Sequence, residues 1–350
     1  MNPLAAPTAP RLRHESVNKR TGERSGVEMV VAIHSTRLGP ALGGVRLWHY
    51  HDETQGAEDA LRLSSAMTLK AAAAGLDLGG GKGVICAPPG PPPNGEQRRA
   101  ILDDFGDLVE SLDGSYITAE DVGTSTADMV RIHMRTRHVT GLPLECGGAG
   151  DPSPFTAMGV QAAMRAAARY AFGSSGLAGR RVCVVGLGHV GWHLARGLAQ
   201  AGAALTVADI DPRKRTLAKR LGARWLEPEE AMLAEVEILA PCAVGGAIDS
   251  ENADRLACRI LCGAANNQLA EPGLDHSLDQ RGILFAPDFI ANAGGLINVY
   301  RELKGYGARR ATELTLGIEK TMDRILARAA AECVTPLDAA TALASERLGE

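Results

Sequence analysis

Residues 67–84 read MTLKAAAAGLDLGGGKGV and hold two lysines, Lys70 and Lys82. Lys70 ends a helical pattern, whereas Lys82 follows three glycines and leads into an apolar run that predicts a buried strand. Because glycine has no side chain, backbone and ligand can approach the Lys82 ammonium closely. A lysine near a second cation and away from water has a lowered pKa, and a neutral lysine can act as a general base. The alternative, two solvated lysines on a flexible turn, is disfavoured by the apolar residues that flank the glycines.

The length and composition predict an α/β protein of two domains. A chain of 350 residues is longer than a typical single domain. Apolar residues make up 45% and charged residues 22%, as in an ordinary globular chain, and the 41 glycines suit many tight turns between strands and helices. A net charge of −4 argues against nucleic acid as the main partner.

Neither a membrane nor a metal is expected as a partner. No apolar run is long enough to span a bilayer, and residues 1–19 lack the apolar core of a signal peptide, so a cytoplasmic location is expected. The seven cysteines are scattered through apolar contexts and are predicted to be buried, reduced thiols. Neither the cysteines nor the histidines show the spacing of metal ligands.

Strands and helices alternate in the first half of the chain, which predicts an α/β domain. The residues before 27 are rich in Pro, Arg and Ser and are predicted to be loosely ordered. The expected strands are 27–34, 45–48 and 116–119; helices are expected at 58–74 and 97–112, a further helix beginning at 124–128, and a turn at 39–44.

A shift to Gly and Pro at 146–152 predicts a domain boundary, with an Ala-rich helix at 153–172 after it. Residues 181–191 then read RVCVVGLGHVG: a strand, a Gly-x-Gly-x-x-Gly turn and the start of a helix that runs from 190 to 200. A second strand at 204–208 ends at Asp209. This order is typical of a dinucleotide-binding unit, in which the glycines allow a tight turn, close approach of the pyrophosphate and close packing of helix on strand.

Asp209 favours NAD as the cofactor, because its carboxylate can accept hydrogen bonds from ribose hydroxyls and would repel a 2′-phosphate. Arg213 and Lys214 keep NADP as an alternative. Further strands are expected at 237–242, 259–267 and 283–288, each ending in small or polar residues as at a ligand crevice. Residues 292–299 are expected to be a glycine-rich entry to another helix, and helices are expected at 309–332 and 336–348.

Several motifs resemble those of the glutamate/leucine/phenylalanine/valine family of amino-acid dehydrogenases, most closely its leucine and phenylalanine branch. They are LGGVR at 42–46, MTLK at 67–70, GGGK at 79–82, AEDVGT at 119–124, PSP at 152–154, GAANNQ at 263–268 and NAGG at 292–295. The resemblance runs from about residue 27 to beyond 324. The sequence departs from the family pattern at His189 and at Asp151, and either change could alter cofactor affinity.

The resemblance implies reversible, NAD-dependent oxidative deamination of an L-amino acid to a 2-oxo acid and ammonia. It also implies a substrate-binding and oligomerisation domain at 1–147, a Rossmann-type doubly wound NAD domain at 148–324, and a C-terminal helix at about 325–350 that returns to the first domain. A homo-oligomer is expected, because the apolar strand at 27–34 has an otherwise unexplained surface and the family assembles through its first domain.

The resemblance also assigns roles to single residues. Lys70 matches the lysine that binds the substrate carboxylate, Lys82 the base that works through a water, and Asp121 the aspartate that handles the amino group. The asparagines at 266 and 267 match residues that contact substrate and cofactor. The residues implied in cofactor binding are Thr156, Gly186, Gly188, His189, Val190, Gly191, Asp209, Ile210, Cys242, Ala243, Ala264, Asn266 and Asn292. An alternative is a nucleotide-binding sensor without turnover, which the intact set of two lysines and one aspartate disfavours.

The side-chain pocket is predicted to be apolar. Leu42 stands where the glutamate branch has a lysine, and Val299 where that branch has a small hydroxyl residue. A substrate carboxylate between them would be an unpaired buried charge. The residues expected to bind substrate, besides Lys70, are Leu42, Gly43, Gly44, Met67, Ala119, Asn267, Leu296 and Val299. Ala119 resembles the leucine branch and Leu296 the phenylalanine branch, so branched-chain amino acids are expected to be best, with Phe or Trp as runner-up and glutamate excluded.

Overall fold

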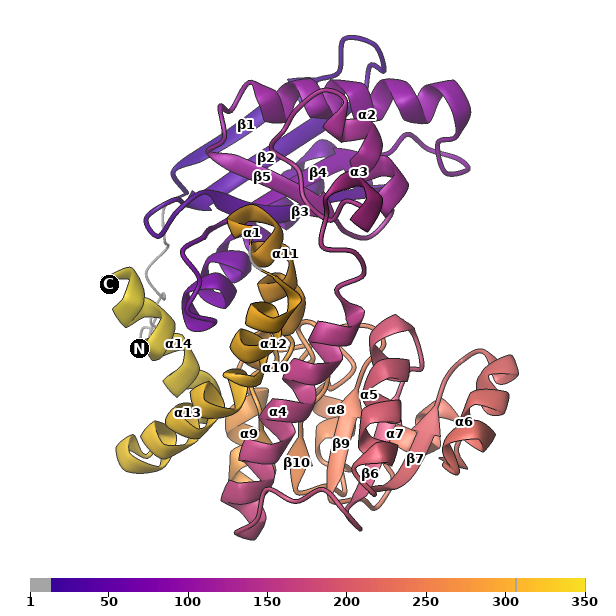
Figure 1. Ribbon diagram of the computed structural model, residues 1–350, viewed down its shortest axis with the longest axis vertical. Helices are drawn as coiled ribbons and strands as arrows, with labels where there is room; N and C mark the ends of the chain where they lie inside the picture. The colour runs from indigo at the N-terminus through magenta and orange to yellow at the C-terminus, as the bar shows by residue number, and fades with distance from the viewer. Residues whose placement is uncertain (1–13, 306, 350) are drawn as a thin grey trace, which may run out of the picture. The chain divides into compact units, whose positions relative to one another are not determined.

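The computed structural model describes residues 14–305 and 307–349, which divide into two compact units (Figure 1). Unit 1 holds residues 14–72 and 77–146, and unit 2 holds residues 73–76 and those from 147 onward. The loose order predicted for residues 1–13 lies outside the described residues. In the described part of the chain, no helix is both long and apolar enough to cross a bilayer.

Unit 1 is built on a five-stranded mixed sheet in the order β1-β2-β4-β3-β5. The strands are β1 (Ser16–Thr21), β2 (Glu28–Ser35), β3 (Ala41–Trp48), β4 (Gly79–Cys86) and β5 (Tyr116–Glu120). β1, β2 and β4 pair antiparallel, whereas β4, β3 and β5 pair parallel. Two expectations were wrong here: β1 lies in a segment predicted to be loosely ordered, and most of the predicted turn at 39–44 belongs to β3.

The early start of β3 follows from its glycines. A Cβ atom added at Gly43 would lie 1.7 Å from the carbonyl oxygen of Gly81 on β4. Strands can approach this closely only where a side chain is missing. The same glycines that suggested a turn in the sequence therefore extend the strand.

Helices cover both faces of this sheet (Figure 1). Along β2, Met29, Val31 and Ile33 pack with α2 (Gly95–Glu110) and α3 (Thr126–His133), whereas Val30 and Ala32 pack with α1 (Glu53–Ala73). The alternation follows from the two-residue period of a strand. The prediction that the strand at 27–34 has an unexplained apolar surface was therefore wrong, because both faces of the strand are covered within this chain.

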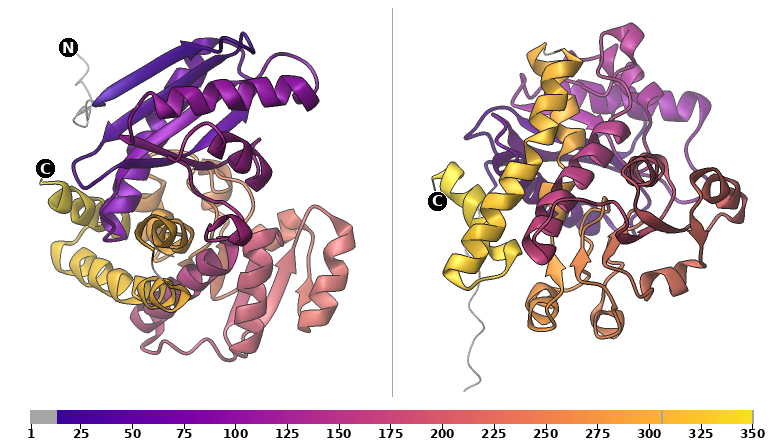
Figure 2. Two further views of the ribbon diagram at one scale, coloured as in Figure 1. Left: turned by 45° about the horizontal axis from the view of Figure 1, so that its top comes forward. Right: turned by 60° about the horizontal axis from the view of Figure 1, so that its bottom comes forward.

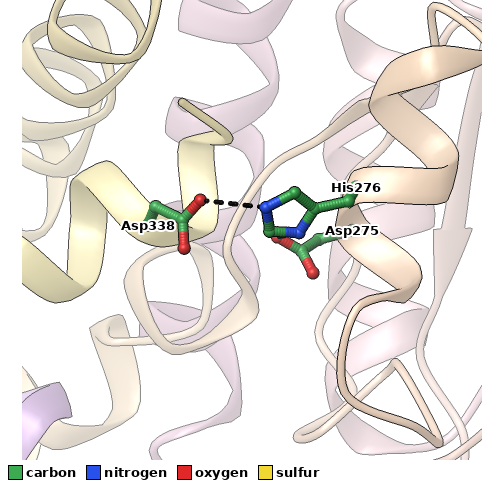
Figure 3. A group of neighbouring side chains, drawn as sticks. All are labelled: Asp275, His276 and Asp338. Carbon is green, nitrogen blue, oxygen red and sulfur yellow. Dashed lines mark ion pairs between the residues drawn. The ribbon is translucent and has the colours of Figure 1, made fainter. Parts of the chain in front are cut away.

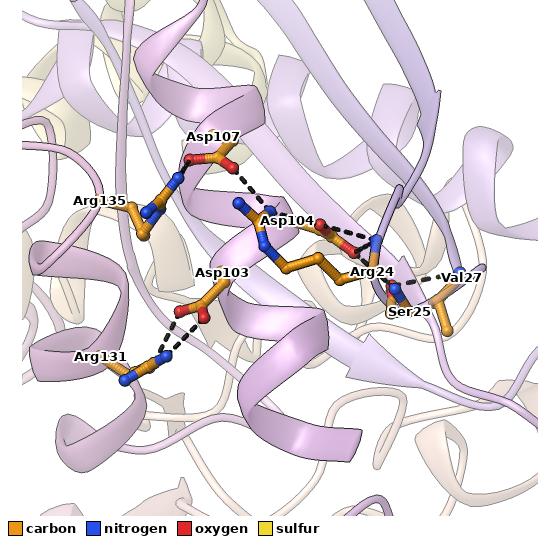
Figure 4. A network of polar contacts seen from close by, with 8 residues as sticks. All are labelled: Arg24, Ser25, Val27, Asp103, Asp104, Asp107, Arg131 and Arg135. Atoms are coloured by element: carbon orange, nitrogen blue, oxygen red, sulfur yellow. Dashed lines mark hydrogen bonds and ion pairs between the residues drawn. The ribbon is translucent and has the colours of Figure 1, made fainter. Parts of the chain in front are cut away.

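A polar network fixes the turn between β1 and β2 onto α2 (Figure 4). Asp104 of α2 is buried and accepts hydrogen bonds from the backbone N–H of Ser25 at 2.8 Å and from the guanidinium of Arg24 at 2.8 Å. Arg24 also pairs with Asp107, which in turn pairs with Arg135. Burial alone would raise the pKa of Asp104, but these hydrogen bonds hold it below its usual value.

Unit 2 contains a parallel six-stranded sheet in the order β11-β10-β9-β6-β7-β8. The strands are β6 (Arg181–Val185), β7 (Ala204–Ala208), β8 (Arg224–Trp225), β9 (Ile238–Pro241), β10 (Ile260–Leu261) and β11 (Leu284–Phe285). The order reverses between β6 and β9, as in a doubly wound dinucleotide-binding fold. The expected fold class is thus confirmed. Only β8, a two-residue strand, was not predicted.

Helices lie on both faces of this second sheet (Figure 2). The helices of unit 2 are α4 (Ser153–Phe172), α5 (His189–Gln200), α6 (Arg215–Leu221), α7 (Pro228–Met232), α8 (Ser250–Ala253), α9 (Leu274–Gln280), α10 (Asp288–Ala291), α11 (Gly294–Lys304), α12 (Ala308–Leu316), α13 (Ile318–Glu332) and α14 (Pro336–Leu348). The single helix expected at 309–332 is divided at Gly317, which caps both α12 and α13. All seven cysteines are free, but Cys146 and Cys333 are exposed, contrary to expectation.

Candidate active site

Lys82 of β4 and Asp121, directly after β5, meet across β3. The Nζ atom of Lys82 lies 2.8 Å from Oδ2 of Asp121. Gly44 lies on the intervening strand, where it pairs with Ala119 of β5. A Cβ atom at Gly44 would lie 2.9 Å from the Cβ of Asp121 and 2.5 Å from the carbonyl oxygen of Glu120. The glycine therefore leaves the room in which the lysine reaches the carboxylate.

Burial and charge act in opposite directions on Lys82, which is only 5% exposed. Burial lowers the pKa of Lys82 and the Arg46 cation adds to this effect, whereas Asp121 opposes it. Burial alone would raise the pKa of Asp121, but Lys82 and Arg46 hold it below its ordinary value. A lysine with a lowered pKa is suited to taking a proton near neutral pH.

Sequence reasoning missed Arg46. It named Lys82 and Asp121 and included Arg46 in the LGGVR motif, but it gave Arg46 no role in the site. The structure shows Arg46 of β3 donating from Nε to Oδ2 of Asp121 at 2.9 Å. The available signal was its position in the strand, two residues after Gly44 and therefore on the same face.

The glycines before Lys82 do not leave open space for a ligand, as the sequence had suggested. A Cβ atom at Gly80 would lie 2.1 Å from the backbone nitrogen of Thr68 on α1. A Cβ atom at Gly81 would lie 2.6 Å from the ring of Tyr116. The glycines therefore allow α1 and β5 to close onto β4, and the protein itself fills the space.

The other predicted substrate residues of unit 1 lie on three elements, β3, β5 and α1. Leu42 is buried on β3 and Ala119 is half-buried on β5, while Met67 and Lys70 are half-buried on α1. Because Leu42 and Gly44 are two residues apart in one strand, they share a face. Unit 1 therefore brings one apolar side chain and the two polar groups of the predicted site to the same part of its sheet.

Three predicted substrate residues belong to unit 2. Leu296 is buried and Val299 is half-buried on α11. Asn267 is exposed and has a φ of 50°. Asparagine tolerates this left-handed conformation better than most residues do. Such strained positions cluster at functional sites, and this gives Asn267 a structural reason to be singled out.

The predicted phosphate-binding turn has the geometry that its glycines indicate. Gly186 has a φ of 103°, and a Cβ atom at Gly191 would lie 1.8 Å from the carbonyl oxygen of Gly186. Gly188, by contrast, is exposed, has no atom within 4 Å of an added Cβ and caps the N-terminus of α5, which begins at His189. The first and third glycines are thus required by close packing, and the second leaves its backbone open to a ligand.

Asp209, at the end of β7, is buried and already engaged by the chain. Its Oδ2 accepts hydrogen bonds from the backbone of Leu187 at 2.7 Å and from Lys214 at 2.8 Å, and its Oδ1 accepts one from the backbone of Asp211 at 2.9 Å. The neighbouring Ile210 is 90% exposed. The negative charge expected to exclude a 2′-phosphate is therefore partly neutralised by Lys214.

A surface cavity of about 770 Å³ lies beside this turn. It is lined by Asp151, Leu187, Gly188, His189, Trp192, His193, Arg196, Lys214, Leu217 and Arg220. Five of these residues can carry positive charge. An exposed glycine backbone at a helix N-terminus, next to a cation-rich cavity, suits a ligand that carries phosphate.

The remaining predicted cofactor residues lie where the central strands of unit 2 end. Cys242 and Ala243 follow β9, and Ala243 lies against Gly186. The side-chain nitrogen of Asn292 donates to the carbonyl oxygen of Ala264 at 3.2 Å and to Oδ1 of Asn266 at 2.9 Å. The buried Oδ1 of Asn292 accepts no hydrogen bond within the described residues. This buried acceptor and the open Gly188 fit a dinucleotide along the carboxyl edge of the sheet.

Thr156 and Val190 complete the predicted cofactor set. Thr156 lies in the first turn of α4, where its hydroxyl donates to the carbonyl oxygen of Pro152 at 3.1 Å, and a Cβ atom at Gly295 would lie 2.6 Å from that hydroxyl. Val190 is half-buried in the first turn of α5.

One group of possible metal ligands occurs in the described part of unit 2 (Figure 3). Nδ1 of His276 lies 3.3 Å from Asp275, and Nε2 of the same ring lies 3.5 Å from Asp338. The imidazole thus faces the two carboxylates with different nitrogens, and one ligand atom from each of the three side chains lies within 4.8 Å of the others. They link α9 to α14 and are not assigned to an ion.

Comparisons with known proteins agree with this geometry. A family model described as Glu/Leu/Phe/Val dehydrogenase, dimerisation domain, matches residues 12–138, and one described as Glutamate/Leucine/Phenylalanine/Valine dehydrogenase matches residues 206–349. The leucine dehydrogenase of Bacillus subtilis is 44% identical over 93% of this chain and 89% of its own length. The valine dehydrogenase of Streptomyces virginiae is 42% identical over 96% of this chain and 94% of its own length.

Among solved structures, the L-tryptophan dehydrogenase of Nostoc punctiforme superposes with a TM-score of 0.84 at 38% identity and covers 96% of both chains. A hetero-hexameric glutamate dehydrogenase from Thermus thermophilus superposes with a TM-score of 0.79 at 26% identity, covering 96% of this chain and 88% of the other.

Proposed function

This chain belongs to the glutamate/leucine/phenylalanine/valine dehydrogenase family, and on that premise we propose that it catalyses the reversible, NAD-dependent oxidative deamination of an apolar L-amino acid. The products are the 2-oxo acid and ammonia. The observation that carries the proposal is the buried contact between Lys82 and Asp121, at 2.8 Å. A homologue without turnover would have no need to bury a lysine against a carboxylate, since burying a charge costs free energy.

The chain's own residues have distinct roles in this proposal. Lys70 binds the substrate carboxylate and Asp121 holds the amino group. When bound, a nicotinamide would supply the hydride acceptor for Cα, and the uncharged substrate amine would become an iminium. Lys82, whose pKa burial lowers, takes the proton from the water that adds to this iminium when the lysine is in its uncharged form. Lys82 then returns this proton to the amino group and takes the hydroxyl proton of the adduct as ammonia leaves, which gives the 2-oxo acid.

The cofactor is a nicotinamide dinucleotide, and we propose NAD rather than NADP. Asp209 supports this, since a carboxylate at the end of the second strand disfavours a 2′-phosphate. The contact of Lys214 with Asp209 reduces that discrimination and keeps NADP as the alternative.

The side-chain pocket supports aliphatic substrates. Leu42 is buried in unit 1, so a glutamate side chain placed beside it would leave its carboxylate without a partner. The similarity to leucine and valine dehydrogenases supports branched-chain amino acids. A preference for Phe or Trp is the second candidate, supported by the similarity to the tryptophan dehydrogenase. One methylene of misfit is worth only about 1–3 kcal/mol, so the preference among apolar substrates is expected to be graded.

We propose residues 1–147 as the substrate-binding and oligomerisation domain, and 148–324 as the NAD domain. The match of residues 12–138 to a model described as a dimerisation domain supports a homo-oligomer.

A panel of L-amino acids tests the proposal. Purified protein is mixed with NAD and each amino acid, and NADH formation is followed by absorbance. Leu, Ile and Val are expected to give the highest kcat/KM, and glutamate no turnover. Efficient turnover of glutamate would contradict the apolar pocket. A strong preference for Phe or Trp would mean that Leu296, rather than Ala119, reports the pocket shape.

A further inference from the structure

Four side chains of unit 1 form a row of alternating charge that begins at Lys82. Lys82 contacts Oδ2 of Asp121 at 2.8 Å, and Nε of Arg46 donates to the same oxygen at 2.9 Å. Nη1 of Arg46 then donates to Oδ2 of Asp59 at 2.8 Å. The hydroxyl of Tyr50 donates to that oxygen at 2.8 Å. The row therefore runs from the buried lysine of β4, over β3, to α1.

The contacts of Asp121 are divided unequally between its two oxygens. Both cations contact Oδ2, and Oδ1 accepts no hydrogen bond from any residue that the structure describes. An arginine has a planar, rigid guanidinium, so a contact from Nε restricts the rotation of the carboxylate. The carboxylate is thus held with one oxygen occupied and the other available to a ligand.

Arg46 is itself held in place from the far side. The side chains of Arg46 and Asp59 are 22% and 14% exposed. A cavity of about 580 Å³ opens next to them, lined by Arg46, Trp48, Tyr50, Gln55, Glu58, Asp59, Arg62 and Val122. In such a partly buried setting a charge-assisted contact is stronger than on an open surface. Burial and the Asp59 carboxylate raise the pKa of Tyr50, so its hydroxyl stays a donor.

We propose that Arg46 is a positioning residue of the reaction: anchored by Asp59, it fixes the Asp121 carboxylate so that one oxygen faces Lys82 and the other is free for the amino group. This inference rests on the proposed function, in which Lys82 is the base and Asp121 binds the amine. A second consequence is electrostatic, because a carboxylate shared between two cations stabilises each charge less than a carboxylate that serves only one.

Substitutions at Arg46 and at Asp59 are expected to shift the pKa of Lys82 in opposite directions. The charged groups that act on Lys82 are Asp121 after β5, Arg46 on β3 and Asp59 on α1, while its partner on β2 is the apolar Ala32. α1 also carries Lys70, which is common to every variant below. Removing Arg46 leaves two carboxylates acting on Lys82 and raises the pKa of the lysine. Removing the charge of Asp59 leaves Arg46 unbalanced and lowers that pKa.

The test compares the pH dependence of kcat/KM for leucine and NAD in Arg46→Gln, Arg46→Lys and Asp59→Asn. The acidic limb of this profile reports the deprotonation of the base in the free enzyme. We expect Arg46→Gln to move the limb to higher pH by about one pH unit and Asp59→Asn to move it to lower pH. Arg46→Lys, which keeps the cation, should restore most of the wild-type limb.

The matched control is Arg135→Gln, which removes an arginine whose ion pair with Asp107 is partly exposed on another face of unit 1. The acidic limb of its pH profile for kcat/KM should match that of the wild type. NADH binding and thermal unfolding verify that each variant is folded. If Arg46→Gln does not fold, the shift to lower pH in Asp59→Asn remains the required result.

Two failures are distinguishable. If Lys82→Ala keeps its activity, Lys82 is not the general base and the proposed function is wrong on that point. If Lys82→Ala is inactive but the limb stays in place in both Arg46→Gln and Asp59→Asn, the proposed function stands and the role of Arg46 is overturned. Shifts of the same sign in the two variants would also overturn it.

Discussion

At the scale of single residues, the site depends on the absence of a Cβ atom at Gly44. Gly44 lies on the strand between Lys82 and Asp121, where an added Cβ would meet the Cβ of Asp121 and the backbone of Glu120. The lysine in turn is buried, so its charge is stabilised by the carboxylate and by little else. Substitutions at Gly44, Lys82 or Asp121 are therefore expected to reduce activity more than they reduce the free energy of unfolding.

Gly44→Ala is expected to reduce activity strongly with a moderate loss of stability. The new Cβ would meet the Cβ of Asp121 and the backbone of Glu120, so β5 must shift, which costs about 1–3 kcal/mol. We expect kcat to fall at least tenfold while the protein stays folded. Steady-state kinetics and chemical denaturation check this, with Gly176→Ala as control, because an added Cβ there meets only a side-chain hydroxyl at 3.5 Å. Wild-type kcat in Gly44→Ala would contradict the account.

His34 is expected to make the protein less stable in mild acid. It is 3% exposed, its Nδ1 lies 2.8 Å from the Thr68 hydroxyl, and burial lowers its pKa from 6.5 to about 4. Between these values the unfolded chain binds a proton and the folded chain does not, so stability falls as the pH falls. The contribution is up to about 3 kcal/mol. Urea unfolding at pH 7 and pH 4.5 should show a smaller acid loss in His34→Gln than in the wild type; equal losses would exclude this role.

At the scale of elements, each glycine-rich segment is placed by what packs against it. Because these glycines lack a Cβ, α1 packs closely against Gly80, the ring of Tyr116 against Gly81, and the predicted phosphate-binding turn against Gly191. The elements that carry the predicted site therefore approach one another more closely than ordinary side chains allow. The loop after β7 affects the predicted cofactor site in another way, because Lys214 folds back and donates a hydrogen bond to Asp209.

Lys214→Ala is expected to strengthen the preference for NAD over NADP. The substitution removes the cation that neutralises Asp209, so the carboxylate repels a 2′-phosphate more strongly. The measurement is kcat/KM with each cofactor, together with binding of 2′,5′-ADP and of ADP to the protein. Arg213→Ala is the matched control, since Arg213 is 89% exposed and pairs with Asp211 instead. If the wild type prefers NADP, Lys214 or Arg213 dominates the ribose site.

The limits of sequence reasoning are visible in particular elements. Periodicity located α4 and α14 at their observed bounds, and the Gly-x-Gly-x-x-Gly pattern located the doubly wound unit, because these signals are local. The start of β3 and the break at Gly317 could not be predicted, since they depend on what lies opposite in space. For the same reason Lys82 and Asp121 were identified as residues, while Arg46 became visible only through its contacts.

At the scale of the whole molecule, the basis for expecting an oligomer has changed. The apolar strand β2 is covered by α1 on one face and by α2 and α3 on the other, so it does not call for a partner. β1 is one of the two edge strands of the sheet, and an edge strand can pair with a second copy. The family model that covers this region is described as a dimerisation domain.

The protein is expected to sediment as a homo-oligomer at micromolar concentration. Pairing along β1 or a larger surface of unit 1 would bury area that a single copy leaves exposed. Analytical ultracentrifugation is the measurement, and Lys19→Pro, which places a proline in the edge strand, is the variant expected to weaken assembly. A single species near 36.6 kDa for the wild type would contradict this expectation.

The most direct test of the account is the turnover of Lys82→Ala, because the buried lysine carries the proposed chemistry. We predict that the variant binds NADH as the wild type does, since the cofactor residues lie in unit 2, and that kcat falls by about 10²- to 10⁴-fold. NADH binding is measured by fluorescence titration, and folding is verified by thermal unfolding. A folded variant that keeps more than about a tenth of the wild-type kcat would show that Lys82 is not the base.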